Sequence, residues 1–509
     1  MYQLNLGFCI VLTLFVRPYE CDTRFSNDAG RSFPASPKIA IVGAGVGGAA
    51  VAYFLKELGH NTGIIDLYEK SNAIGGRLHT VDLYGKSYET GGSIIHPRNQ
   101  YAQNLVKKLN LRKKGREPSS GFALVKDQQV VFTTSSWNVL TLMRILWRYG
   151  LGFNHLMSVT NSLIDDFSRI YSVQQKRVSY ENPYELLSAM SPSLANLTRS
   201  TFKRFLKELQ LKEILIEELV QAITYVNYGQ NAGIHSFAGS IAIAGADDGL
   251  WSIENGNKQL PRALVQASNA RLLLNANVES VTDNQNGTYG LKVTSDQKLI
   301  TRHYDLVVLA NPLEVSQIEF FNFTRLPYNV KDRKYHRTVA TIVAGVLREN
   351  FTMAAEKVES LFTCDSSEFY TSIGRIYPVD SPGTIKADAT GEKQPDYPVY
   401  KIFSPAPLTE KQLEIIFLQV HLVKVFDWKA YPEYDRVPET FPSFVLDERN
   451  LLYLNSIEWA ASAIEMSLIS AKNIALLISQ RIDGNEPSYL SRVEDGKLIQ
   501  DGDINKIEL

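Results

Sequence analysis

The chain has 509 residues, of which 44% are hydrophobic, so it can bury a large core and is too long for one simple domain. Its 53 basic and 54 acidic residues give a net charge of -1, and nothing in this balance favours nucleic acid as a partner. Three cysteines exclude a disulfide framework, and because no CxxC pair or histidine cluster has the spacing of metal ligands, we predict no metal.

The N-terminus resembles a targeting segment. Leu4 to Val16 is apolar and uncharged, and a polar stretch follows from Glu20 to Ser36, so residues 1–20 are predicted to be a cleaved secretory signal peptide. A basic start and a clear cleavage site are missing, which leaves an uncleaved anchor as the alternative. Together with the leader, four Asn-x-Ser/Thr sequons predict a glycoprotein of the lysosome or the secreted fraction; they lie at Asn196, Asn286, Asn322 and Asn350.

A dinucleotide-binding fingerprint follows the leader. Ile39 to Val42 reads as a buried parallel strand, and Ala49 to Leu58 as a helix. Between them are three glycines with GxGxxG spacing: Gly43 for the tight turn, Gly45 for approach of a pyrophosphate, and Gly48 for close packing of helix on strand. The helix N-terminus would supply unpaired N–H groups to the phosphates.

A second strand completes this unit. Gly63 to Tyr68 is expected to be a strand that ends at Glu69, whose carboxylate can accept hydrogen bonds from a ribose. Glu69 follows Gly48 by about 20 residues, the distance that the fingerprint requires.

Helical patterns dominate residues 121–250, including Leu194 to Tyr225. The stretch from Ser136 to Met157 is predicted to form one broadly apolar helix with Arg144 and Arg148 as its cations. Such a helix can line a lipid tunnel or lie on a membrane surface, and the alternative is a buried helix whose arginines snorkel.

The remaining elements return to the nucleotide unit. Ala276 to Val281 and Tyr304 to Ala310 are predicted strands of the nucleotide sheet, and Asp380 to Pro398 is an expected exposed loop. Near the C-terminus, Leu451 to Leu454 is strand-like, and Asn455 is predicted to open a helix that continues to Ile478.

Two further segments resemble the flavin amine oxidase superfamily. Ala73–Leu78 and Glu89–His96 are similar to the GGR and ExGG segments, which in that superfamily run beside the pyrophosphate and the isoalloxazine ring. The resemblance implies FAD, with Arg77 as a phosphate partner and Glu458 holding the ribityl chain. The residues expected to bind the cofactor are Gly43, Gly45, Gly48, Glu69, Gly76, Arg77, Gly91, Gly92, Val278, Glu458 and Met466.

The fold class that follows is α/β, with a Rossmann-type FAD-binding domain of the flavin amine oxidase class and an intertwined, helix-rich substrate domain. We assign three stretches of the chain to the FAD-binding domain: 38–120, 251–315 and 451–480. Residues 121–250 and 316–450 are assigned to the substrate domain, and 481–509 to a C-terminal tail.

At the level of family, the chain resembles prenylcysteine oxidase, also called prenylcysteine lyase, from about Lys38 to about Ile478. The resemblance rests on short segments in a fixed order: Trp147–Gly150, Val226–Gln230, Gly249–Lys258, Lys401–Ser404, Ala430–Pro432 and Ala460–Ser467. One departure is Trp459, where a cysteine is expected in vertebrate members, so that position cannot carry a required thiol. Neither Cys21 nor Cys364 lies in a flavin motif, and the FAD is therefore predicted to be non-covalent.

The family implies that S-prenyl-L-cysteine, oxygen and water give an isoprenoid aldehyde, cysteine and hydrogen peroxide. Sulfur and the allylic alkene stabilise the cation left by hydride loss, so no strong protein base is needed. The catalytic residues are unknown, with His96, Tyr228 and Trp251 as candidates and Asn255 and Asn257 nearby. Peripheral membrane contact is a further expectation. Two alternatives remain: a flavin oxidase acting on an amine or another lipid, and a non-catalytic isoprenoid-binding protein.

Overall fold

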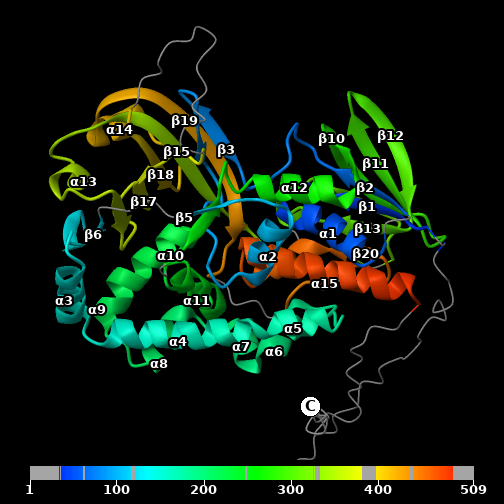
Figure 1. Cartoon of the computed structure of the whole chain (residues 1–509), viewed down its shortest axis with the longest axis horizontal. Helices are drawn as coiled ribbons and strands as arrows, with labels where there is room; N and C mark the ends of the chain where they lie inside the picture. Colours follow the sequence, from blue (N-terminus) through cyan, green and yellow to red (C-terminus); the bar gives the residue numbers. More distant parts are fainter. Residues whose placement is uncertain are drawn as a thin grey trace, which may run out of the picture.

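The computed structural model describes residues 34, 36–60, 63–115, 121–246, 249–324, 326, 333–380, 397–435 and 440–484 (Figure 1). The predicted leader with Cys9 and Cys21, most of the predicted loop from Asp380 to Pro398 and the tail beyond residue 484 lie outside the described residues. No helix within the described ranges is long and apolar enough to cross a bilayer.

A five-stranded parallel sheet forms the nucleotide-binding half. Its strand order is β20-β13-β1-β2-β9, and every neighbouring pair is parallel. Helix α1 packs against α12 and α15 on one face of this sheet (Figure 1). The strands and helices have these bounds: β1 (Lys38–Val42), β2 (Ile64–Tyr68), β9 (Arg271–Leu273), β13 (Leu306–Leu309), β20 (Leu451–Tyr453), α1 (Val46–Glu57), α12 (Gln259–Ser268) and α15 (Ile464–Ile482).

The predicted fingerprint elements are confirmed. Strand β1 is buried except for its first residue, as expected for a strand covered on both faces. Strand β13 confirms the prediction for Tyr304 to Ala310, because it pairs with β1 in the sheet. Helix α1 begins at Val46, directly after Gly45, so its first turn lies at the end of β1 as the motif requires.

A separate four-stranded sheet, in the order β12-β11-β10-β14, covers the other face. The expectation that Ala276 to Val281 joins the nucleotide sheet is therefore wrong, because this segment is the start of β10. A tight turn between Asn284 and Thr288 pairs β10 with β11 instead, and Val278 and Val281 pack against Tyr68 from outside the parallel sheet. The strands are β10 (Ala276–Asp283), β11 (Tyr289–Ser295), β12 (Lys298–Tyr304) and β14 (Glu319–Phe321).

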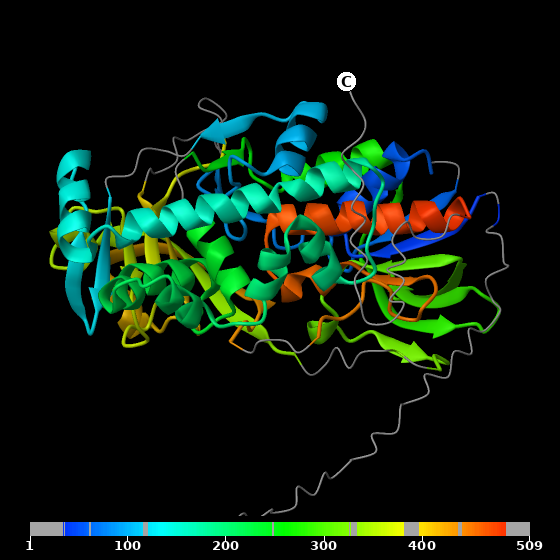
Figure 2. The ribbon, with the colours of Figure 1, turned by 90° about the horizontal axis from the view of Figure 1, so that it is seen from below.

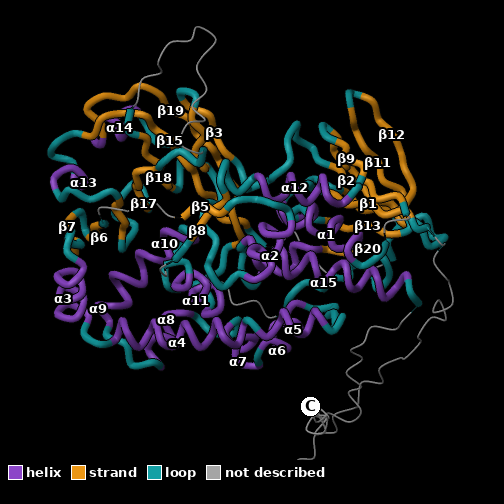
Figure 3. Tube along the Cα trace, viewed as in Figure 1, coloured by secondary structure: helices purple, strands orange, loops and turns teal. Residues whose placement is uncertain are grey.

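The other half holds a seven-stranded sheet with helices beneath it (Figures 1 and 3). Its strand order is β19-β15-β18-β17-β16-β6-β7, so an early hairpin extends a sheet built from later residues, and the two halves are intertwined. The strands are β6 (Phe122–Lys126), β7 (Gln129–Thr133), β15 (Tyr335–Leu347), β16 (Ser360–Thr363), β17 (Ser372–Ile376), β18 (Val399–Ser404) and β19 (Phe417–Pro432).

The helical layer consists of α3 (Asn138–Tyr149), α4 (Gly152–Phe167), α5 (Arg169–Gln175), α6 (Pro183–Met190), α7 (Pro192–Leu197), α8 (Phe202–Glu208), α9 (Glu213–Leu215), a π-helical turn (Ile216–Val220), α10 (Gln221–Tyr228) and α11 (Ser236–Ala244). Figure 2 shows α4 running along the molecule, with α3 upright at one end. Smaller elements complete the fold: α2 (Gln100–Lys108), α13 (Thr352–Ala355), α14 (Glu410–Ile416), β3 (Thr80–Leu83), β4 (Lys86–Glu89), β5 (Lys113–Gly115), β8 (Trp251–Ile253) and two 3-10 turns, η2 (Leu313–Val315) and η4 (Leu454–Trp459).

Two predicted helices have different bounds in the structure. The single helix expected from Ser136 to Met157 is wrong, because Gly150 takes φ +69° and ends α3, and α4 starts after it. The helix expected from Asn455 begins at Ile464 instead. Residues Leu454–Trp459 form the 3-10 turn η4, every residue of which is buried.

Candidate functional site

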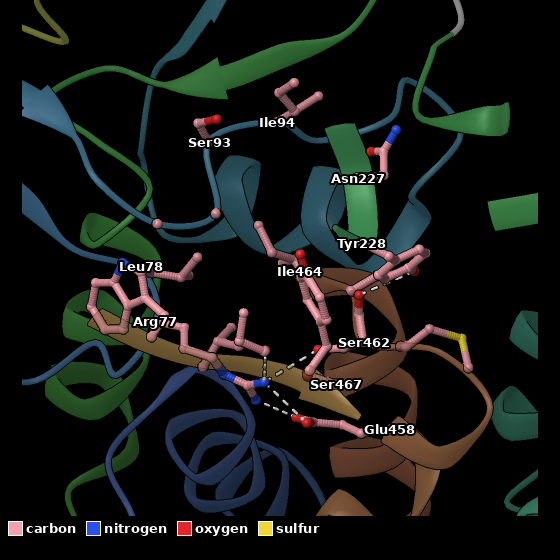
Figure 4. Close-up of a pocket in the computed structure, with 18 of the residues that line it drawn as sticks. Arg77, Leu78, Ser93, Ile94, Asn227, Tyr228, Glu458, Ser462, Ile464 and Ser467 are labelled. Atoms are coloured by element: carbon pink, nitrogen blue, oxygen red, sulfur yellow. Dashed lines mark hydrogen bonds and ion pairs between the residues drawn. The ribbon is translucent and has the colours of Figure 1, made fainter. Parts of the chain in front are cut away.

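One cavity of about 930 Å³ lies where the two halves meet. The glycine-rich loop after β1, the segment from Glu69 to His79 and the start of α15 line one side of it. Side chains of α4, α10, α11 and strands β17 to β19 line the other. Figure 4 shows Arg77, Glu458 and Ser462 on the first side, and Tyr228 reaching toward Ser462.

The three fingerprint glycines meet three different constraints. Gly43 has φ +109°, and a Cβ there would lie 2.8 Å from the carbonyl oxygen of Ala310, so the turn requires glycine. A Cβ at Gly48 would lie 2.0 Å from the Gly43 oxygen, which explains why Gly48 packs the helix onto the strand and does not line the cavity. Gly45 lines the cavity, and a Cβ there would meet nothing within 4 Å. The space at Gly45 is therefore open to a ligand.

Glu69 lines the cavity at the end of β2. Its carboxylate accepts hydrogen bonds from the Ala44 amide at 2.9 Å and from the Ser71 hydroxyl at 2.8 Å, so it is tied to the glycine loop and held in place. The GGR segment is anchored to the same loop, because the Gly75 amide donates to the Ala44 oxygen at 3.1 Å. Both segments thus form one rigid edge of the cavity.

Arg77 and Glu458 form an ion pair at the cavity floor, in which the carboxylate side chain is buried and the arginine side chain is 32% exposed. The guanidinium donates to both carboxylate oxygens, one at 3.0 Å, and also to the Ala430 oxygen at 2.6 Å. Glu458 is 1% exposed and accepts further hydrogen bonds from Tyr335 at 2.8 Å and Asn455 at 2.8 Å. The carboxylate raises the pKa of Arg77 above its ordinary value against the opposing effect of burial. The expected contact of Arg77 with a phosphate stays a prediction. The sequence did not predict that Arg77 pairs with Glu458.

The remaining residues expected to bind the cofactor divide into two groups. Gly76, Gly91, Gly92 and Met466 line the cavity. Val278 does not, because its side chain is buried in the cluster between the two sheets of the nucleotide half. Any contact from Val278 to a cofactor would come from its backbone.

The residues present fit a flavin dinucleotide. The first turns of α1 and α15 both reach the cavity with unpaired N–H groups, which suit phosphates and an electron-rich ring. Two buried acceptors at the cavity, Asn311 Oδ1 and Asn455 Oδ1, have no hydrogen-bond partner, and a buried unpaired acceptor is costly unless a ligand satisfies it. With the open space at Gly45, these features suit a long, polar cofactor lying across the glycine loop.

Of the five candidates for the substrate face, two line the cavity. His96 lies at its wall, with Nδ1 accepting a hydrogen bond from the Arg98 amide at 3.1 Å. Tyr228 is buried, and its hydroxyl donates to the Ser462 oxygen at 3.4 Å. Burial raises the pKa of Tyr228 far above its usual range, so its hydroxyl stays protonated and able to donate a hydrogen bond.

Trp251, Asn255 and Asn257 do not line the cavity, which contradicts their placement on the substrate face. The backbone of Trp251 pairs with Ile95, and Lys113 lies over its ring at 4.5 Å. Asn255 occupies a turn with φ +64°. Asn257 is fully buried and joins the ExGG segment to β8, because its side-chain amide donates to the Gly92 oxygen at 3.0 Å. These residues support the site from behind.

Lys401 is a cavity residue that the sequence reasoning missed. It lies on β18, and burial lowers the pKa of its ammonium. Its Nζ is 3.5 Å from the backbone oxygen of Glu89, whose carboxyl pKa burial raises to about 7. The segment Lys401–Ser404 had been singled out only as a family-like segment, and an alternating strand pattern does not show that one lysine faces inward.

The wall opposite the glycine loop is largely apolar. It combines side chains from the helical layer and the seven-stranded sheet, so it is a surface for a hydrocarbon chain. Its apolar members are Leu163, Ile164, Phe167, Leu194, Phe237, Ile241, Phe362, Phe403 and Trp428.

The described residues contain no group of three His, Cys, Asp or Glu able to hold a metal ion. Cys364 is buried away from the cavity lining, and burial raises its thiol pKa to about 12. Trp459 is also buried, with Nε1 donating to Glu314 at 2.5 Å.

Comparison with known proteins agrees with this architecture. The family model for prenylcysteine lyase matches residues 132–489, and one for an NAD(P)-binding Rossmann-like domain matches residues 41–109. Prenylcysteine oxidase 1 of Bos taurus is 33% identical over 477 residues, covering 90% of this chain and 91% of the relative. Prenylcysteine oxidase 1 of Homo sapiens is 33% identical over 473 residues, covering 90% and 92%.

A solved structure of a putrescine oxidase variant shares the fold, with a TM-score of 0.58 and 16% identity over 87% of this chain and 98% of that one. The fold class and the family predicted from the sequence are therefore confirmed. The chain belongs to the prenylcysteine lyase family, and it is an FAD-dependent oxidoreductase.

Proposed function

We propose that this protein oxidises the thioether of S-prenyl-L-cysteine, with a farnesyl or geranylgeranyl chain. One molecule each of substrate, oxygen and water gives an isoprenoid aldehyde, L-cysteine and hydrogen peroxide. The observation that carries the proposal is the apolar wall, which faces the glycine loop across one continuous cavity. The names of the relatives, prenylcysteine oxidase 1, support the same substrate class.

The apolar wall binds the isoprenoid and excludes water from most of the substrate. Each buried methylene contributes about 0.8 kcal/mol, so the hydrocarbon chain dominates affinity and its length fixes where the sulfur lies. FAD, when bound, supplies a two-electron acceptor for hydride and returns the electrons to oxygen. Sulfur and the allylic double bond stabilise the positive charge on C1 after hydride loss.

The second half of the reaction adds water to C1, and we assign Lys401, which lines the cavity, as the group that receives the proton of that water. Burial lowers the pKa of this amine, which increases the fraction that is neutral and able to accept at Nζ. The Lys401 ammonium that results can donate to the backbone oxygen of Glu89, which lies 3.5 Å from Nζ. The hemithioacetal then collapses to aldehyde and thiol.

Anaerobic reduction of the purified holoprotein, followed at the flavin absorbance band, tests the proposal. Farnesylcysteine and geranylgeranylcysteine should bleach the flavin at low concentration. S-methylcysteine should fail even at high concentration, since it lacks both the apolar anchor and the allylic stabilisation. Equal bleaching by simple amines would favour an amine oxidase, and a purified chain that takes up no FAD would contradict the proposed oxidation.

We further propose that the protein follows the secretory pathway to the lysosome or the outside of the cell and is glycosylated. All four sequon asparagines are exposed. One lies on α7 and three lie in turns or loops: Asn196, Asn286, Asn322 and Asn350. When the protein is expressed in a secretory host, digestion with an endoglycosidase should lower its apparent mass. Each single Asn→Gln variant should show a smaller decrease in mass than wild type. An unchanged mass would contradict the proposal.

A further inference from the structure

The largest group of exposed apolar side chains lies on and beside α3, at the end of the molecule seen on the left of Figure 1. We call it the α3 ridge. Trp147 is 87% exposed and Trp137 74%, values far above those of a core helix. The ridge consists of Trp137, Val139, Leu140, Leu142, Met143, Leu146, Trp147 and Leu151.

The ridge is held in this orientation by its inner face. Tyr149 is buried, and Ile145 packs against the same hydrophobic cluster. Arg148 donates two hydrogen bonds to the buried carboxylate of Glu218, at 2.6 and 2.7 Å. These contacts fix the rotation of α3 about its axis, so the apolar side chains of the ridge face solvent. The alternative prediction, a buried helix whose arginines snorkel, is therefore wrong for α3.

The charges around the ridge suit a negatively charged surface. Between Asp127 and Asp165 the sequence contains no acidic residue. Arg144 lies on α3 and donates to the backbone oxygen of Thr133 at 2.8 Å. Because this acceptor is uncharged, the hydrogen bond leaves the positive charge of Arg144 uncompensated. The Lys212 ammonium lies beside Gly150, where the ridge ends. Cations beside an apolar helix face with tryptophans at both ends are typical of a helix in the interface of an anionic bilayer.

Packed aromatic rings link the buried inner face of α3 to the cavity. The Tyr149 ring packs on Phe132 at 5.9 Å between centroids, Phe132 on Phe122 at 6.0 Å, and Phe122 on Phe362 at 5.5 Å. Phe362 lines the cavity. Helix α4 starts directly after the ridge, and its last turns also line the cavity.

We propose that the α3 ridge docks the protein on an anionic lipid bilayer, with α3 lying in the plane of the interface. At 12 residues α3 is about 18 Å long, far less than the roughly 30 Å of a bilayer core, so it lies in the interface and does not span. The docking extends the proposed function, because a prenylated substrate partitions into membranes, but the contact itself needs no turnover.

Vesicle binding of the full-length holoprotein tests the proposal. Wild type, Leu142→Glu and Trp147→Glu are mixed with phosphatidylcholine vesicles, with and without phosphatidylserine, and the bound fraction is measured by sedimentation. Leu299→Glu is the matched control, since Leu299 is 54% exposed against 48% for Leu142, and it lies on β12 at the opposite end of the molecule.

Wild type and Leu299→Glu should bind phosphatidylserine-containing vesicles equally, and each ridge variant should bind at least about tenfold more weakly. Flavin reduction by a short, soluble S-prenylcysteine analogue should be the same in all four proteins, which separates docking from the proposed function. The proposal would be overturned if wild type stays in the supernatant. It would also be overturned if Leu142→Glu and Leu299→Glu lose vesicle binding to the same extent. If wild type binds no vesicles and is a dimer that Leu142→Glu dissociates, then the α3 ridge contacts a second copy of this chain and not a bilayer.

Discussion

The two walls of the cavity are built in different ways. The wall formed by the glycine loop, the segment after Glu69 and the start of α15 acts through glycines and backbone N–H groups within short stretches of chain. One ion pair, between Arg77 and the distant Glu458, adds to them. The opposite wall takes single side chains from helices and strands far apart in sequence, such as Leu163, Phe237 and Trp428. A cofactor site can therefore be specified by local motifs, while a hydrocarbon site depends on side-chain volumes that only the assembled fold brings together.

The largest effect is expected from Gly45→Val on the cofactor wall. Gly45 has φ -70°, which valine adopts without strain, and its Cβ would meet no protein atom within 4 Å. The valine should therefore leave the fold intact and occupy the space of a pyrophosphate. We expect the purified variant to retain less than about a tenth of the wild-type flavin per protein, measured from the absorbance ratio.

Two controls sharpen that test. Gly115→Val places the same side chain in open space outside the cavity and should keep its flavin. Glu69→Gln loses only charge-assisted hydrogen bonding, about 1.5 to 3 kcal/mol, and should keep more flavin than Gly45→Val. Equal flavin content in Gly45→Val and Glu69→Gln would show that the phosphate loop lies elsewhere.

The second effect concerns Lys401, which lines the cavity from β18. Lys401→Met removes the proton acceptor and should lower kcat about tenfold or more with unchanged flavin content. Lys401→Arg should not restore the rate, because guanidinium stays protonated. The kcat should also rise with pH in wild type, as the amine loses its proton, and this rise should vanish in Lys401→Met. Full activity in Lys401→Arg would show that charge, and not proton acceptance, is what the reaction needs.

A smaller effect is expected on the apolar wall. Ile241→Ala removes three carbon atoms from the surface that binds the isoprenoid, which should raise KM for geranylgeranylcysteine about tenfold. Flavin content should not change, because Ile241 lies on α11, away from the glycine loop. Steady-state peroxide production measures KM, and a loss of flavin in this variant would contradict the separation of the two walls.

The smallest effect concerns the pH dependence of stability at the start of α15. Burial raises the pKa of the Glu465 carboxyl from 4.5 to about 7, although it accepts hydrogen bonds from Tyr171 and the Ala102 amide. The pKa of Glu465 in the folded protein lies above its pKa in the unfolded chain, so the protonated carboxyl stabilises the fold. This stabilisation is complete below about pH 4.5 and is lost as pH rises through about 7. Glu465 should therefore take on the order of 1 kcal/mol or more from the unfolding free energy between about pH 5 and pH 8. His235 contributes in the opposite direction, because burial lowers the pKa of its imidazole to about 3.

Urea unfolding at the two pH values measures this loss. Glu465→Gln should reduce it, while the exposed Glu349→Gln should leave it unchanged. Part of the pH dependence of the unfolding free energy should remain in Glu465→Gln, because burial also raises the pKa of the Glu89 carboxyl. A slope identical to wild type in Glu465→Gln would show that Glu465 stays ionised in the folded protein.

The sequence by itself determined the cofactor wall. Gly43, Gly45, Gly48 and Glu69 follow a fixed local geometry, because a turn, a close approach and a helix start each constrain neighbouring residues only. The order of family-like segments likewise identified the family before any contact was known.

Only the tertiary structure decided the rest. Whether Lys401 faces inward, whether Trp251 and Asn257 face the cavity or support it, and which partner Arg77 holds depend on segments hundreds of residues apart. The α3 ridge shows the same limit, since its apolar pattern fits a core helix and an interfacial one equally well. Burial is a property of what packs against a helix, and the helix's own sequence does not contain that information.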